Sequence, residues 1–145
     1  MLNPDSSNYV EEVVSPEPRI NVADVRDAHP ETKTAGIAEA IDELPEGGGT
    51  LWFPADRGPY VLTGGRQVIK NYYNAKGVVV TTKNHVHWRS DGAVIQYQSP
   101  DYTYIFSTTS GQNPKQRCLA QPATDYYFKG LTFDGMGKAR SGFYV

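Results

Sequence analysis

The sequence has a single cysteine, no long hydrophobic run and no excess of charge of one sign. Cys118 has no partner within the 145 residues, which excludes an intrachain disulfide. No apolar stretch approaches the roughly 18 residues of a membrane-spanning helix, so we expect no membrane span and no membrane partner. Lys and Arg number 14 against 16 Asp and Glu, a net charge of -2 that does not favour nucleic acid as a partner.

The N-terminus also lacks the basic region and apolar stretch of a recognisable signal peptide. Residues 1–18 are polar and contain Pro4, Pro16 and Pro18, which predicts a flexible, extended arm. Residues 19–145 are then expected to form one domain, incomplete at its C-terminus. We favour an extracellular or virion-surface location, the latter needing no signal peptide.

Three consecutive glycines at residues 47–49 are the strongest local signal. The apolar residues Ile37, Ala38, Ile41 and Leu44 recur at helical spacing just before them, and Thr34 is the expected N-cap. The glycines permit a sharp turn with positive φ, after which residues 50–53 are typical of a buried strand that Pro54 ends. The predicted order is therefore helix, turn, strand.

Short strands are expected throughout the rest of the chain, with little helix between them. The candidates are residues 20–25 (a strand or its approach), 51–53, 60–62, 77–82, 86–88, 93–97, 104–107 and 126–133. This spacing fits a coil of parallel strands with a helix at its start, and it also fits an antiparallel sandwich or small barrel.

Four segments near the N-terminus follow an order that resembles the N-terminal module of the pectate-lyase-like superfamily. A strand containing Asp at residues 20–25 leads to an Ala- and Ile-rich helix at 34–42, then to Gly-Gly-Gly and a strand ending in Phe-Pro at 47–54, then to Tyr-Val-Leu at 60–62. Gly-Leu-Thr-Phe-Asp-Gly at 130–135 resembles a later strand of the same family.

The resemblance implies an all-β fold, a right-handed parallel β-helix of which this chain holds the first few rungs, with an N-terminal capping α-helix. It also implies a lyase, glycoside hydrolase or epimerase acting on uronate-containing or other acidic polysaccharides. Its catalytic rungs would lie beyond residue 145, so whether this chain is itself an enzyme stays open. The alternative is a non-catalytic glycan-binding or structural module, such as a phage tail spike or fibre shaft.

Both hypotheses predict polysaccharide as a partner, and a homotrimer or association through an uncapped last rung. The candidate substrate-binding residues, which cluster near the C-terminal end, are Asp125, Tyr127, Lys129, Asp134 and Arg140. Cleavage of a polysaccharide needs paired carboxyl groups, or a base beside a cation. A turn at Asp134 and solvated loop charges would explain the same residues, and no catalytic residue can be assigned.

Two histidines, His85 and His87, alternate along a predicted strand and would face the same side of it. A metal site needs a third ligand, and His29, the remaining histidine, has nothing in the sequence that places it nearby. We therefore expect no metal site and no evident cofactor. Ca²⁺ enters only by analogy with the family.

Overall fold

The fold is described here from a computed structural model of the chain. The structure describes residues 13–65, 79–80, 83–100, 104–107, 125–139 and 141–144. Residues 13–18 of the predicted arm lie within these ranges.

The first helix begins where the sequence predicts a strand. β1 (Arg19–Asn21) is followed directly by α1 (Val22–Ala28). The Asn21 side chain accepts hydrogen bonds from the backbone N–H groups of Ala23 at 3.0 Å and Asp24 at 3.3 Å, as an N-cap residue does. The predicted strand therefore ends at Asn21, because this cap starts a helix in which the same apolar residues are buried.

The second helix, α2 (Ile37–Glu43), lies within the predicted helix. The predicted apolar stripe is buried, as expected, at Ile37, Ala38, Ile41 and Leu44. The N-cap position belongs to Gly36 instead of Thr34, but the Thr34 hydroxyl still accepts a hydrogen bond from the N–H of Ala38 at 3.1 Å. In the part of the chain that is described, no helix has the length and apolar character that a membrane crossing requires.

Nine further strands follow the helices in the described residues. They are β2 (Gly49–Phe53), β3 (Tyr60–Leu62), β4 (Val79–Val80), β5 (Val86–Ser90), β6 (Val94–Tyr97), β7 (Tyr104–Ser107), β8 (Tyr126–Lys129), β9 (Thr132–Asp134) and β10 (Ser141–Tyr144). A short 3-10 helix, Ala55–Arg57, connects β2 to β3. The single strand predicted for residues 126–133 is divided by a turn at Gly130, where φ is 78°.

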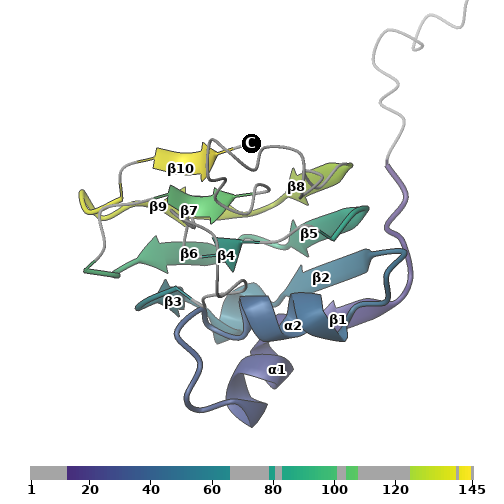
Figure 1. Cartoon of the computed structure of the whole chain (residues 1–145), viewed down its shortest axis with the longest axis horizontal. Helices are drawn as coiled ribbons and strands as arrows, with labels where there is room; N and C mark the ends of the chain where they lie inside the picture. Colours follow the sequence, from purple (N-terminus) through teal and green to yellow (C-terminus); the bar gives the residue numbers. More distant parts are fainter. Residues whose placement is uncertain are drawn as a thin grey trace, which may run out of the picture.

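The strands form three small sheets, with the orders β1-β2-β5-β8, β10-β7-β4 and β3-β6-β9. Every pairing found among the described strands is parallel, whereas a sandwich or small barrel of hairpins would be antiparallel. From β2 onward the chain gives one strand to each sheet in turn. Figure 1 shows the strands of each sheet stacked in layers, with α1 and α2 beside the lowest ones.

The predicted fold class needs correction. The chain is not all-β, and its short parallel sheets do not show a right-handed parallel β-helix. The described residues combine α1 and α2 with three separate sheets of three or four strands. The prediction was wrong because it treated one helix as an addition to a core made of strands. In the structure two helices contribute apolar side chains to the same core as the strands.

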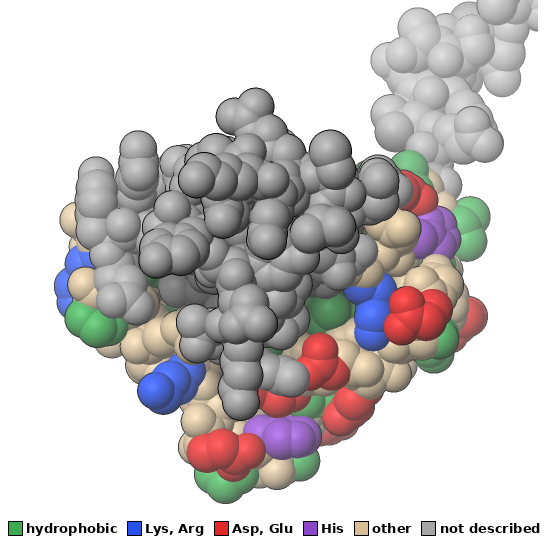
Figure 2. All heavy atoms as spheres, viewed as in Figure 1, with side chains coloured by type: hydrophobic (Ala, Val, Ile, Leu, Met, Phe, Trp, Pro, Cys, Tyr) green, Lys and Arg blue, Asp and Glu red, His purple; other side chains and the backbone are tan. Residues whose placement is uncertain are grey.

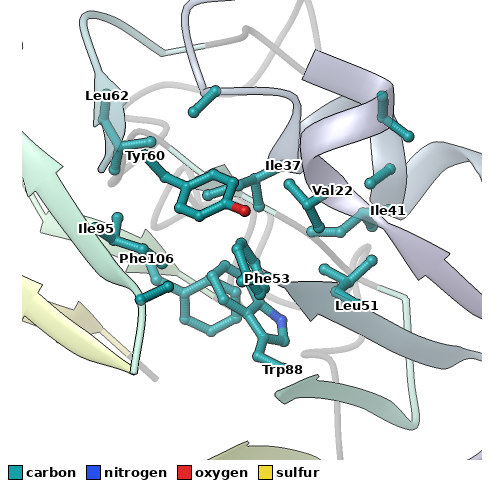
Figure 3. Packing of buried hydrophobic residues seen from close by; sticks show 14 of the residues in the cluster. Val22, Ile37, Ile41, Leu51, Phe53, Tyr60, Leu62, Trp88, Ile95 and Phe106 are labelled. Carbon is teal, nitrogen blue, oxygen red and sulfur yellow. The ribbon is translucent and has the colours of Figure 1, made fainter. Parts of the chain in front are cut away.

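The core lies between the helices and the inner faces of the sheets. Figure 3 shows Phe53, Tyr60 and Trp88 packed together beneath side chains of the helices. The ring of Phe53 lies 5.2 Å from that of Tyr60 and 5.6 Å from that of Trp88, between ring centroids. Such aromatic pairs contribute about 1 kcal/mol each beyond the burial of their surface. This packing fixes the inner face of the sheet β1-β2-β5-β8.

Candidate functional site

The outer face of the sheet β1-β2-β5-β8 carries the side chains that point away from the core. The register aligns Thr50, His87 and Tyr127 in one row across β2, β5 and β8. Side chains on a strand alternate between its faces, so a second outer row lies two residues further along each strand. We call this surface the outer face.

The second row aligns Trp52, Arg89 and Lys129 on the same three strands. The guanidinium of Arg19 lies 4.3 Å from the centroid of the Trp52 ring, and that of Arg89 lies 4.8 Å from the Tyr127 ring. Each contact has the geometry of a cation-π interaction, which restrains the arginine side chain. We call these five residues the cation strip.

Two histidines and an aspartate meet beside the cation strip, at the start of β5 and β8. One ligand atom each from His85, His87 and Asp125 lies within 4.8 Å of the other two. Nδ1 of His85 contacts Oδ2 of Asp125 as a hydrogen bond or ion pair, and the two imidazole rings are 5.4 Å apart. These three residues are called the histidine cluster below.

The backbone explains why these side chains converge. Gly48, His85 and Asp125 directly precede β2, β5 and β8, and all three have positive φ, at 85°, 57° and 61°. A positive φ is rare in residues other than glycine, and His and Asp adopt it more readily than most. A Cβ on Gly48 would lie 1.9 Å from the carbonyl oxygen of His85, so that position excludes a side chain. At the equivalent positions before β5 and β8, the chain carries the His85 imidazole and the Asp125 carboxylate.

The environment of His87 differs from that of its two neighbours. Its residue surface is 3% exposed, whereas the side chains of His85 and Asp125 are 47% and 62% exposed. Burial lowers the pKa of His87, the Arg89 guanidinium and the neighbouring His85 lower it further, and Asp125 acts in the opposite direction. The neutral imidazole, which has a free nitrogen lone pair, is therefore the favoured form.

The segment before β1 contributes to the burial of the outer face. The Thr50 hydroxyl donates a hydrogen bond to the carbonyl of Pro16 at 2.6 Å, and the Arg89 guanidinium donates one to the carbonyl of Val13. Residues 13–18, predicted to belong to a flexible arm, thus make specific contacts with β2 and β5. They leave the β8 edge of the outer face more exposed, since Lys129 is exposed and Tyr127 half-buried.

The structure brings together three of the five predicted site residues. Asp125 directly precedes β8, and Tyr127 and Lys129 lie on its outer side. Asp134 ends β9 in another sheet, where its side chain accepts a hydrogen bond from the N–H of Met136 at 2.9 Å, so the turn interpretation explains it. Arg140 lies outside the described residues.

Sequence reasoning did not find the neighbours of these residues. His85 and Asp125 are 40 positions apart, and only the pairing of β5 with β8 places them side by side. A usable signal was present, because Val-His-Trp-Arg at 86–89 and Tyr-Tyr-Phe-Lys at 126–129 align position by position as inward and outward residues. Asp125 is therefore the third candidate ligand, which the sequence analysis did not associate with His85 and His87. Arg89 joins the cation strip by the same alignment.

A second region of interest is a shallow hollow of about 460 Å³ beside the helices. Its lining residues are His29, Glu31, Glu39, Asp42 and Glu43. Acidic side chains and a histidine lie together on the lower part of the surface in Figure 2. The hydroxyls of Thr32 and Thr34 already donate hydrogen bonds to Glu39. Within the described ranges, only the histidine cluster brings three metal-ligating atoms this close, so the hollow is the weaker candidate.

Comparison with protein-family models, curated proteins and solved structures finds no significant match to this chain. The resemblance to the pectate-lyase-like superfamily therefore stays a prediction from residues 20–62 and 130–135.

Proposed function

We propose that this chain binds acidic polysaccharides through the outer face, as part of a polysaccharide-processing protein. The observation that carries this proposal is the cation strip, in which three cationic side chains line up with two aromatic rings on one face of a sheet. Neighbouring strands lie about 4.8 Å apart, so Arg89 on β5 and Lys129 on β8 are one strand apart, whereas Arg19 on β1 is separated from Arg89 by β2. A linear chain of uronate residues offers a row of negative charges that can meet these cations across the sheet.

The chemistry of the strip suits carboxylates. Arginine binds a carboxylate through two parallel N–H groups, and such charge-assisted hydrogen bonds are about twice as strong as neutral ones. Arg19 and Arg89 are held against Trp52 and Tyr127, which reduces the entropy lost when a ligand is bound. Lys129 is exposed at the β8 edge, where it can meet a ligand first.

Binding of acidic glycan is a requirement shared by an enzyme and by a non-catalytic module such as a tail spike. The proposal therefore concerns recognition and assigns no bond-breaking step. Asp125 contacts His85, an arrangement that serves ligand binding as well as proton transfer.

The test is binding of polygalacturonate and of a neutral glucan, measured by isothermal titration calorimetry at two salt concentrations. Polygalacturonate is expected to bind, more weakly at higher salt, and the neutral glucan is not. Arg89→Gln should weaken binding about tenfold, since one lost charge-assisted contact corresponds to about 1.4 kcal/mol or more. Lys129→Gln should weaken it by a smaller factor because its side chain is exposed.

Lys138→Gln is the matched control. Lys138 is exposed like Lys129 but lies in the turn after β9, away from the outer face. Loss of affinity in Lys138→Gln equal to that in Lys129→Gln would point to a general charge effect and contradict the proposal. Equal binding of the neutral and acidic polymers would also contradict it.

A further inference from the structure

We propose that His85, His87 and Asp125 form a binding site for a divalent transition-metal ion, with Zn²⁺ as the best match to the ligand types. Imidazole and carboxylate are both zinc ligands, and three protein ligands with one open position are typical of zinc sites that also take water or another molecule. The inference does not depend on glycan binding by the cation strip.

The distances allow such a site after a small adjustment. Ligand atoms about 2.1 Å from one tetrahedral ion lie about 3.4 Å apart. The three candidate atoms already lie within 4.8 Å of one another, so the largest gap must close by about 1.4 Å. His85 and Asp125 are about half exposed, and rotation of their side chains can supply this movement while buried His87 stays in place.

An ion pair between His85 and Asp125 explains part of this arrangement and leaves His87 unexplained. Among the described residues, Nδ1 of His87 is buried with no hydrogen-bond partner. A buried polar atom without a partner costs about 1 to 3 kcal/mol and calls for an explanation such as a bound ion. Its ring is held 5.1 Å from the Tyr127 ring, which limits the orientations by which it could find another partner.

The surrounding charges are compatible with a cation. Arg89, two residues along β5 from His87, is a positive group that opposes it, and its guanidinium is directed to the Tyr127 ring and to the carbonyl of Val13. The Asp125 carboxylate supplies the negative charge. The backbone at both His85 and Asp125 has positive φ, a conformation that costs free energy and that persists where surrounding structure holds it, frequently at functional sites.

The experiment titrates the whole chain, freed of metal by chelator and dialysis, with Zn²⁺ alone and with Co²⁺ alone. Calorimetry should give one site with a dissociation constant below about 10 μM, and Co²⁺ should give the visible absorption bands of low coordination number with nitrogen ligands. A ligand that binds the folded state also raises the melting temperature, so Zn²⁺ should stabilise the chain against heat.

Variants identify the ligands. His85→Ala and Asp125→Asn should each weaken Zn²⁺ binding at least tenfold and remove the Co²⁺ bands. Both side chains are about half exposed, so circular dichroism in the presence of chelator should show unchanged folding. His29→Ala and Cys118→Ser are matched controls, since these residue types also bind zinc, and both should bind as the unsubstituted chain does.

Three results would overturn the inference: no single tight site in the unsubstituted chain, unchanged affinity in both His85→Ala and Asp125→Asn, or loss of the site in either control variant. If glycan binding fails while Zn²⁺ binding depends on the histidine cluster as described, the proposed function is wrong and the metal site stands.

Discussion

The two ends of the molecule bury their apolar side chains to different degrees. At the end that carries α1 and α2, Val22, Ile37 and Leu51 are each 0% exposed. At the end formed by β8 and β9, Phe128 and Leu131 pack against the same core and are only partly buried. Figure 1 shows the helices at one end of the stacked strands and β8 at the other.

The difference indicates that the helix end provides most of the stability and that the β8 end is freer to serve binding. Regions with fewer buried apolar contacts open at lower free energy than the well-packed core. The histidine cluster has its most exposed side chain, Asp125, just before β8, and the cation strip ends on β8 at exposed Lys129. Predictions that compare the two ends can therefore test where the stability resides.

The largest effect is expected from a charge placed beneath α2. Ile41 is 4% exposed, and Ile41→Asp buries an unpaired carboxylate, which should destabilise the fold by about 3 to 5 kcal/mol. Leu131→Asp is the matched change at the other end, and because Leu131 is partly exposed we expect about 1 kcal/mol. Urea denaturation gives both values, and equal losses would mean that the two ends contribute alike.

A smaller effect is expected from the turn that begins β2. Gly48→Ala combines a positive φ of 85° with a Cβ position 1.9 Å from the His85 carbonyl oxygen, and should cost about 2 to 3 kcal/mol. Gly137→Ala isolates the backbone cost, since its φ is 67° and no atom lies within 4 Å of the added Cβ. There we expect about 1 kcal/mol.

Thermal unfolding of the two glycine variants measures the difference between them. A loss in Gly48→Ala no greater than in Gly137→Ala would mean that β2 and β5 do not approach as closely as the structure has them. Gly48→Ala should also weaken Zn²⁺ binding, because the turn containing His85 must move to admit the new methyl group.

Local features of this fold could be predicted from the sequence, and the features that depend on pairing could not. The apolar stripe of α2 and the strand Tyr60–Leu62 follow from residue spacing and from Pro and Gly at the ends of segments. The apolar residues Ile20, Val22 and Val25 predict a strand where the structure has α1. The N-cap role of Asn21, which starts the helix, is not evident from that pattern. The class was wrong because spacing alone does not say how strands and helices share one core.

The candidate site divides in the same way. Asp125, Tyr127 and Lys129 were singled out from one stretch of sequence, and the structure places them together on or beside β8. Their partners on β5, His85 and Arg89, come from a distant segment. Parallel pairing between segments so far apart is set by the packing of the inner side chains, which local patterns do not specify.

The smallest effect is expected from the exposed ion pairs that join α1 to the 3-10 helix at the helix end. Arg57 contacts both Asp24 and Asp27, and hydrogen bonds from Arg26 and Arg57 lower the pKa of Asp27 below its usual value. The unfolded chain then binds a proton at Asp27 more readily than the folded chain does. The contribution of Asp27 to the free energy of unfolding is therefore present above about pH 4, and it is lost as the pH falls through the lowered pKa of the folded state.

Asp27→Asn should therefore reduce the dependence of unfolding free energy on pH below about pH 4, with a difference from the unsubstituted chain that shrinks at high salt. Asp56→Asn, at an exposed site in the same 3-10 helix, is the control and should leave that slope nearly unchanged. Because the side chain of Asp27 is 55% exposed, solvent screens the interaction and the change should be well below that of either core substitution. An effect as large as that of Ile41→Asp would mean that ionic contacts, and not the buried apolar side chains, hold the helix end together.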